Sequence, residues 1–171
     1  MQYNRPFESL HWDLIHFEQS LTRTSYLSYS VDPVTKYQLA QDLPSKTDSA
    51  RSLCDQIDLI QNQFDLRVLT VHSDDEKALS DFFKNDATTR GIKLETTPPY
   101  QPEQNSYAER YSALISKIAR QITINTNLPG YLWPKAAKTA VYIQNRIPHR
   151  SIDWQSPHEA LVAYLGYKVP H

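Results

Sequence analysis

The chain has 171 residues, and its 18 Lys and Arg nearly balance its 19 Asp and Glu, so it lacks the strong positive charge of a domain that binds nucleic acid over its whole surface. Its apolar share of 40% and charged share of 22% are typical of a globular chain and exclude a disordered one. A single cysteine excludes an internal disulfide framework, and no apolar run approaches the roughly 18 residues of a membrane span. We expect one domain over residues 1–171, with 1–8 and 164–171 as flanking segments.

The first part of the chain predicts a sheet followed by a helix. Alternating and aromatic residues indicate three strands joined by short connections, at residues 9–17, 25–31 and 35–42. Asp32-Pro33 is a turn signal between the last two. A helical period then covers residues 47–64, and an apolar strand is predicted at 66–71.

The second part predicts more helix than strand. We expect a helix over 76–89 that Gly91 ends, and a short strand at 92–96. Residues 97–105 contain three prolines and no apolar period, so they predict a loop. The remaining helices are expected at residues 106–125, 131–145 and 156–163. This order favours a mixed sheet with helices packed on it.

Three acidic residues occupy positions that need an explanation. Asp13 lies in the middle of the first strand, where a carboxylate is costly unless it is paired or holds a metal. Asp74 directly follows an apolar strand, the usual place for a site in an α/β sheet, although a helix N-cap explains it equally well. Glu109 is expected in the first turn of the long helix, where the helix dipole favours a carboxylate.

The long helix separates an apolar face from a polar one. The face expected in the core comprises Tyr111, Leu114, Ile115, Ile118 and Ile122. The opposite face comprises Glu109, Ala113, Ser116, Lys117 and Arg120. A carboxylate followed by two cations suits a metal beside a phosphate backbone, but it equally suits a solvated charged face.

These residues resemble the Asp-Asp-Glu triad of retroviral and retrotransposon integrases. Asp74 and Glu109 have 34 residues between them, one fewer than in the usual family form. The neighbouring segments that resemble the family are Val71-His72-Ser73-Asp74, Gly91-Ile92, Thr97-Pro98-Pro99-Tyr100-Gln101-Pro102 and Gln104-Asn105-Ser106-Tyr107-Ala108-Glu109-Arg110. Segments similar to copia-type elements, and most of all to fungal members, are Leu128-Pro129-Gly130-Tyr131-Leu132-Trp133, Asn145-Arg146-Ile147-Pro148 and Ser156-Pro157-His158-Glu159-Ala160. The resemblance covers nearly the whole chain.

The resemblance implies a ribonuclease H-like α/β fold, with a five-stranded mixed sheet and helices on both faces. It implies the catalytic core of an LTR retrotransposon integrase, a DDE-type polynucleotidyl transferase that trims the 3′ ends of element cDNA and joins them to host DNA. Asp13, Asp74 and Glu109 would be the catalytic residues and would hold two Mg²⁺ ions, for which Mn²⁺ can substitute. Hard carboxylate oxygens suit both metals. Arg110, Lys117 and Arg120 are the residues expected to contact DNA.

The resemblance also implies partners and a location. We expect element and target DNA as substrates, a homodimer, a higher oligomer in the full-length protein, and no membrane. The place of action would be the nucleus, and before that a cytoplasmic virus-like particle in which the chain is part of a polyprotein. The sequence contains neither the paired His and paired Cys of the integrase zinc module nor its basic DNA-binding module.

The sequence departs from the family at two points near the site. Asp75-Glu76 follows the second aspartate, where the family has Asn-Gly or Asp-Gly, and Ser106 replaces a glycine before Glu109. A related nuclease or transposase of the same fold would have a similar metal site, but residues 128–160 favour an integrase. The alternative of another class is an integrase-like domain, non-catalytic or adopted by its host, that dimerises or binds a partner.

Overall fold

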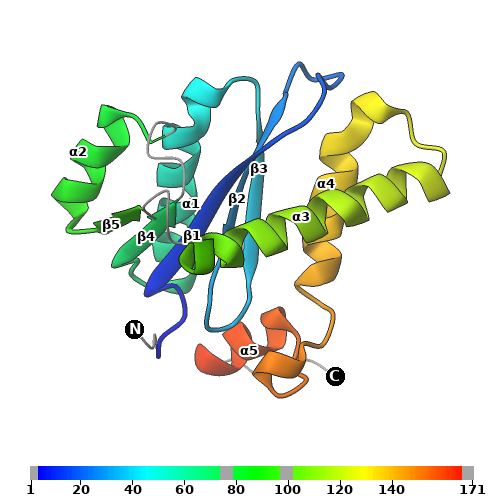
Figure 1. The fold of residues 1–171 in the computed structure, drawn as a ribbon. Helices are drawn as coiled ribbons and strands as arrows, with labels where there is room; N and C mark the ends of the chain where they lie inside the picture. Colours follow the sequence, from blue (N-terminus) through cyan, green and yellow to red (C-terminus); the bar gives the residue numbers. More distant parts are fainter. Residues whose placement is uncertain (1–3, 74–78, 97–101, 167–171) are drawn as a thin grey trace.

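A five-stranded mixed sheet forms the centre of the computed structural model, which describes residues 4–73, 79–96 and 102–166 (Figure 1). Its strands are β1 Ser9–His16, β2 Tyr26–Val31, β3 Gln38–Leu43, β4 Thr70–Ser73 and β5 Lys93–Thr96. They are ordered β3-β2-β1-β4-β5. The pairs β1–β2 and β2–β3 are antiparallel, whereas β1–β4 and β4–β5 are parallel. The predicted five-stranded mixed sheet is therefore confirmed.

Helices cover both faces of this sheet, as predicted (Figure 1). The helices are α1 Ser49–Phe64, α2 Asp81–Arg90, α3 Pro102–Asn125, α4 Trp133–Gln144 and α5 Pro157–Tyr164, with short 3-10 turns η1 Lys46–Asp48, η2 Gly130–Leu132 and η3 Arg150–Ile152. One core packs α1 and α2 against Leu10 and Trp12. The other packs α3 and α4 against Leu27 and Tyr29. Within the described residues, no helix is long and apolar enough to span a bilayer.

Local sequence signals set several helix ends. Ser45 with Asp48 and Ser156 with Glu159 form capping boxes, in which each serine side chain and each acidic side chain satisfies a backbone N–H of the other residue. Gly91 ends α2, as predicted, in a left-handed conformation with φ +71°. This conformation is costly for a residue with a Cβ, so glycine favours the stop.

Some predicted boundaries were wrong. The strand expected at 66–71 is β4 at Thr70–Ser73, and the third strand begins at Gln38 because residues 32–36 form the hairpin turn. The helix α3 begins at Pro102 and not at 106, since proline is favoured in the first helical turn, where its missing N–H is not needed. Glu109 consequently lies in the third turn of α3. The helix dipole acts mainly on the first turn, so it does not explain why a carboxylate occurs at this position.

The hairpin between β2 and β3 is organised around the buried carboxylate of Asp32. Its Oδ1 accepts hydrogen bonds from the backbone N–H groups of Phe7 and Val34, at 3.0 and 3.3 Å. Its Oδ2 accepts from the N–H and the hydroxyl of Thr35, at 2.7 and 2.6 Å. Burial nevertheless raises the pKa of Asp32, because desolvation outweighs the four hydrogen bonds.

We expect Asp32→Ala to lower the free energy of unfolding by about 2–4 kcal/mol, because it leaves buried donors without an acceptor. Urea denaturation measures this change. The matched control is Asp55→Ala on the exposed side of α1, which we expect to change stability by less than about 0.5 kcal/mol. Equal effects of the two variants would contradict the role given to Asp32.

Candidate active site

Asp13 lies at the centre of the sheet because β1 is flanked by β2 on one side and β4 on the other. Side chains alternate along β1, so Leu10 and Trp12 enter the α1 core. Asp13 is on the opposite face, directly across from Tyr29 of β2. Its side chain is half-buried, and its Oδ1 accepts a hydrogen bond of 2.7 Å from the N–H of Leu14.

The helix α3 crosses the face of the sheet that carries Asp13 (Figure 1). Its buried stripe consists of Ala108, Ser112, Ile115 and Ala119, mostly small residues that allow close approach to the sheet. Tyr111, Ile118 and Ile122 are partly buried beside this stripe, as predicted. The prediction for Leu114 was wrong, since its side chain is 36% exposed. The stripe is rotated away from Leu114 because the small residues, and not the largest ones, face the sheet.

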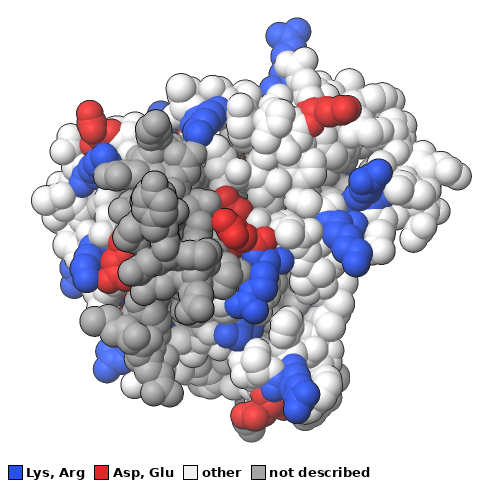
Figure 2. All heavy atoms as spheres, viewed as in Figure 1, with Lys and Arg blue, Asp and Glu red and all other residues white. Residues whose placement is uncertain are grey.

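The two described acidic residues of the predicted triad are thus carried by β1 and by the helix that crosses it. Glu109 is exposed on α3, two residues after Tyr107, whose ring contacts that of His11 with 4.9 Å between centroids. Figure 2 shows acidic atoms beside basic atoms where the N-terminal part of α3 lies. Asp74 lies outside the described residues. Among the residues that are described, no group of three or more His, Cys, Asp or Glu side chains is arranged to hold a metal.

Two histidines stack beside Asp13 on the same side of the sheet. The rings of His11 and His72 are parallel, with 4.4 Å between centroids. The Nδ1 atom of His72 lies 3.3 Å from Glu95, which Lys93 also contacts at 2.7 Å. Burial, followed by the neighbouring charge of His72, lowers the pKa of His11 to about 4, and burial also lowers the pKa of His72. Both imidazoles are therefore neutral at pH 7.

The three cations predicted to contact DNA are exposed on α3. Arg110 follows Glu109 directly, and Lys117 and Arg120 continue along the outer side of the helix. Basic atoms are visible over the course of α3 in Figure 2. Arg120 also borders an apolar pocket of about 540 Å³ that includes Trp133. The prediction that Lys117 and Arg120 lie on the polar, exposed face of the helix is therefore confirmed.

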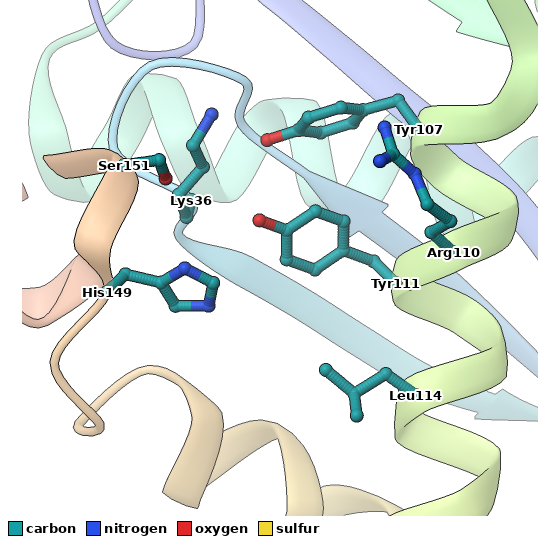
Figure 3. Close-up of a pocket in the computed structure, with 7 residues that line it drawn as sticks. All are labelled: Lys36, Tyr107, Arg110, Tyr111, Leu114, His149 and Ser151. Atoms are coloured by element: carbon teal, nitrogen blue, oxygen red, sulfur yellow. The ribbon is translucent and has the colours of Figure 1, made fainter. Parts of the chain in front are cut away.

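Residues on a neighbouring pocket were missed by sequence reasoning. A pocket of about 350 Å³ separates α3 from the hairpin turn and the segment around η3, and Lys36 and His149 line it (Figure 3). The turn itself was signalled by Asp32-Pro33. No local pattern joins residues 36, 111 and 149, because they meet only through the tertiary fold.

The histidine stack predicts that the protein loses stability in mild acid. The unfolded chain binds a proton on His11 near pH 6.5 and the folded chain only near pH 4, so stability is complete above pH 6.5 and falls as the pH drops toward 4. Between pH 7 and pH 5 we expect a loss of about 1–2 kcal/mol from this residue. Unfolding in urea at both pH values should show a smaller loss for His11→Phe. The control His16→Phe, at an exposed ring, should behave as the wild type.

Comparison with known proteins identifies relatives among transposon polyproteins, although no protein-family model matches the sequence. The retrovirus-related Pol polyprotein from transposon RE1 of Arabidopsis thaliana is 29% identical over 162 residues, which is 92% of this chain and 11% of that protein. The Pol polyprotein from transposon RE2 of the same plant is 29% identical over 145 residues, which is 83% of this chain and 10% of that protein. The Pol polyprotein from transposon TNT 1-94 of Nicotiana tabacum is 31% identical over 91 residues, which is 51% of this chain and 7% of that protein. The chain thus spans about a tenth of the length of these curated relatives.

Solved structures with the same fold are retroviral integrases. The integrase catalytic core domain of HTLV-2, solved in complex with magnesium in a trimeric form, matches with a TM-score of 0.68 at 18% identity, over 91% of this chain and 96% of that one. The simian T-cell lymphotropic virus intasome, solved with the PP2A regulatory subunit B56 gamma, matches with a TM-score of 0.75 at 19% identity. This match covers 97% of this chain and 58% of that one. This likeness confirms the predicted ribonuclease H-like fold. The special similarity to fungal elements stays a prediction, since the relatives above are plant sequences. By its sequence the chain is similar to the Pol polyproteins of retrovirus-related transposons, and by its fold it is similar to retroviral integrase cores.

Proposed function

We propose that this domain is the catalytic core of an LTR retrotransposon integrase, which trims the 3′ ends of element cDNA and joins them to host DNA. The observation that carries the proposal is the half-buried Asp13, held on the central strand under the helix that bears Glu109. A carboxylate at such a place in a sheet is costly unless it has a charged partner or a metal. The relationship to transposon Pol polyproteins supports the same reaction.

The donor set fits Mg²⁺. Asp13 and Glu109 offer hard carboxylate oxygens, and we propose Asp74 as the third ligand. These three carboxylates would hold two ions, with Mn²⁺ as a substitute for Mg²⁺. Bound ions would supply Lewis acidity and would lower the pKa of the attacking water. The HTLV-2 core with the same fold was solved in complex with magnesium.

The two histidines beside Asp13 add no positive charge to the site. The depressed pKa values of His11 and His72 leave their rings uncharged at pH 7, so neither competes with a divalent cation for the carboxylate. The ring of Tyr107 covers His11 from α3. These uncharged rings lie beside the acidic residues and exclude water there. Because the effective dielectric is then lower, the attraction between a carboxylate and a metal ion is stronger.

DNA would lie along α3. Arg110, Lys117 and Arg120 present cations on the exposed side of this helix, where each can contact a phosphate. Such contacts fix the register of the duplex without reading its sequence.

We further propose a homodimer, with higher oligomers in the full-length protein, acting in the nucleus after transport in a virus-like particle. Tyr131, Tyr142 and Ile143 expose apolar surface on and before α4 that a second copy can cover. Trp133 and Val141, by contrast, belong to the core. The solved relatives of this fold include a trimeric form and an intasome.

A disintegration assay tests the reaction, because it asks the core only to resolve a branched DNA with Mg²⁺ or Mn²⁺. We expect Asp13→Asn and Glu109→Gln each to reduce the rate by at least about a hundredfold, the scale on which loss of a charge-stabilising group slows an enzyme. Asp74→Asn should do the same. Asp55→Asn, on the other face of the sheet, should react as the wild type. A folded chain with neither activity nor metal binding would favour the non-catalytic alternative.

A salt titration tests the DNA face. Each of Lys117→Gln and Arg120→Gln should reduce the slope of log affinity against log salt by about 1, since each removes one phosphate contact. Fluorescence anisotropy with a labelled duplex measures the slope. The control is Arg51→Gln on α1, across the sheet. An unchanged slope in both α3 variants would place the DNA elsewhere.

A further inference from the structure

The pocket in Figure 3 combines Arg110, one of the proposed DNA contacts, with residues that have no part in the proposed reaction. It has a volume of about 350 Å³ and lies between α3, the turn of the β2–β3 hairpin and residues 149–151. Lys36 enters it from the turn and Arg110 from the helix. The ring of Tyr111 faces the side chains of Lys36 and His149 across the opening (Figure 3).

Two cations line this pocket, Lys36 and Arg110, and the charge of Arg110 acts on Lys36. The Lys36 ammonium donates a hydrogen bond to the carbonyl oxygen of Pro33 and lies 5.0 Å from the centroid of the Tyr107 ring. Burial lowers the pKa of Lys36, the carboxylate of Asp32 opposes this shift, and the charge of Arg110 adds to it. An ammonium has three donors, so Lys36 retains capacity for an anion. An anion placed between the two cations would relieve their repulsion.

Aromatic rings form the rest of the pocket wall. The ring planes of Tyr111 and His149 are inclined by 29°, with 6.1 Å between centroids, and the centroids of Tyr107 and Tyr111 are 5.0 Å apart. The hydroxyl of Tyr107 is shielded from solvent, and burial together with the neighbouring Tyr111 raises the pKa of Tyr107. Flat rings beside paired cations are the combination on which proteins stack and hold nucleotides of single strands.

The backbone at Lys36 departs from the preference of its residue type. Its N–H closes the turn onto the carbonyl of Asp32 at 2.9 Å, and its φ is +65°, where glycine or asparagine is favoured. A lysine in this conformation is strained relative to those residues. Asparagine at this position would remove the ammonium and would suit the backbone better, so Lys36→Asn separates the role of the side chain from that of the turn.

We propose that this pocket binds one unpaired nucleotide of a DNA strand, with its phosphate between Lys36 and Arg110 and its base against Tyr111 and His149. The volume is sufficient for a ligand of this size. The choice of DNA as the source of the nucleotide rests on the proposed function. The pocket would extend the phosphate contacts of α3 to a single-stranded end or flap.

Binding of a labelled single-stranded oligonucleotide, measured by anisotropy in EDTA, tests the pocket without any catalysis. Lys36→Asn suits the left-handed backbone, so we expect unfolding stability to be kept or raised while Kd increases about tenfold. Tyr111→Leu should also increase Kd about tenfold, whereas Tyr111→Phe and Lys36→Arg should bind nearly as the wild type does. The matched control is Arg51→Gln. A Kd within twofold of the control for both Lys36→Asn and Tyr111→Leu would overturn the proposal.

Competition separates the sources of the phosphate. The oligonucleotide should be displaced by dAMP far better than by inorganic phosphate, because stacking adds to the charge contact. Equal displacement by both competitors would overturn the role of the rings. Binding in EDTA does not depend on the metal-dependent reaction, so failure of the integrase reaction and failure of the pocket give different results.

Discussion

The position of β1 is the constraint on which the rest of the structure depends. It is the only strand in the described sheet that pairs antiparallel on one side and parallel on the other. Its alternating side chains must therefore serve two buried faces at once. Leu10 and Trp12 anchor one face, and this fixes Asp13 on the other. A shift of one residue in register would bury the carboxylate in the α1 core and remove Trp12 from it.

The helix α3 packs on the face of the sheet that carries Asp13 and adds further charged side chains beside it. Its small buried residues let it lie close to the sheet, while its exposed side carries both a carboxylate and cations. Glu109 and Arg110 are adjacent in sequence and turn about 100° apart on the helix. One helix can thus present an acidic group toward the candidate metal site and a basic group toward the pocket beside Lys36. The chemistry of the two sites differs because the helix faces differ, although they share a backbone.

The sequence predicted the order of elements and the mixed sheet well, because strand alternation and helix period are local properties. Boundaries that depend on turns were less accurate, as at β4 and at the start of α3, where prolines were read as a loop although Pro102 begins the helix. Leu114 was assigned to the core by its period, but small residues take that place. Motif resemblance singled out Asp13 and Glu109, whereas Lys36 and His149 were missed because they meet only through tertiary contacts. Asp74 stays a prediction.

The end of α4 has a consequence for how the molecule behaves at high concentration. The side chain of Asn145 accepts a hydrogen bond from the N–H of Gln38 at 2.8 Å and donates one to its carbonyl oxygen at 2.9 Å. Gln38 begins β3, an edge strand of the sheet, and Lys138 of α4 forms an ion pair with Asp42 further along it. The backbone N–H and carbonyl of Gln38 are thus already engaged, and a charged pair lies along the same strand. This edge is therefore protected against the strand-to-strand pairing through which exposed sheets aggregate.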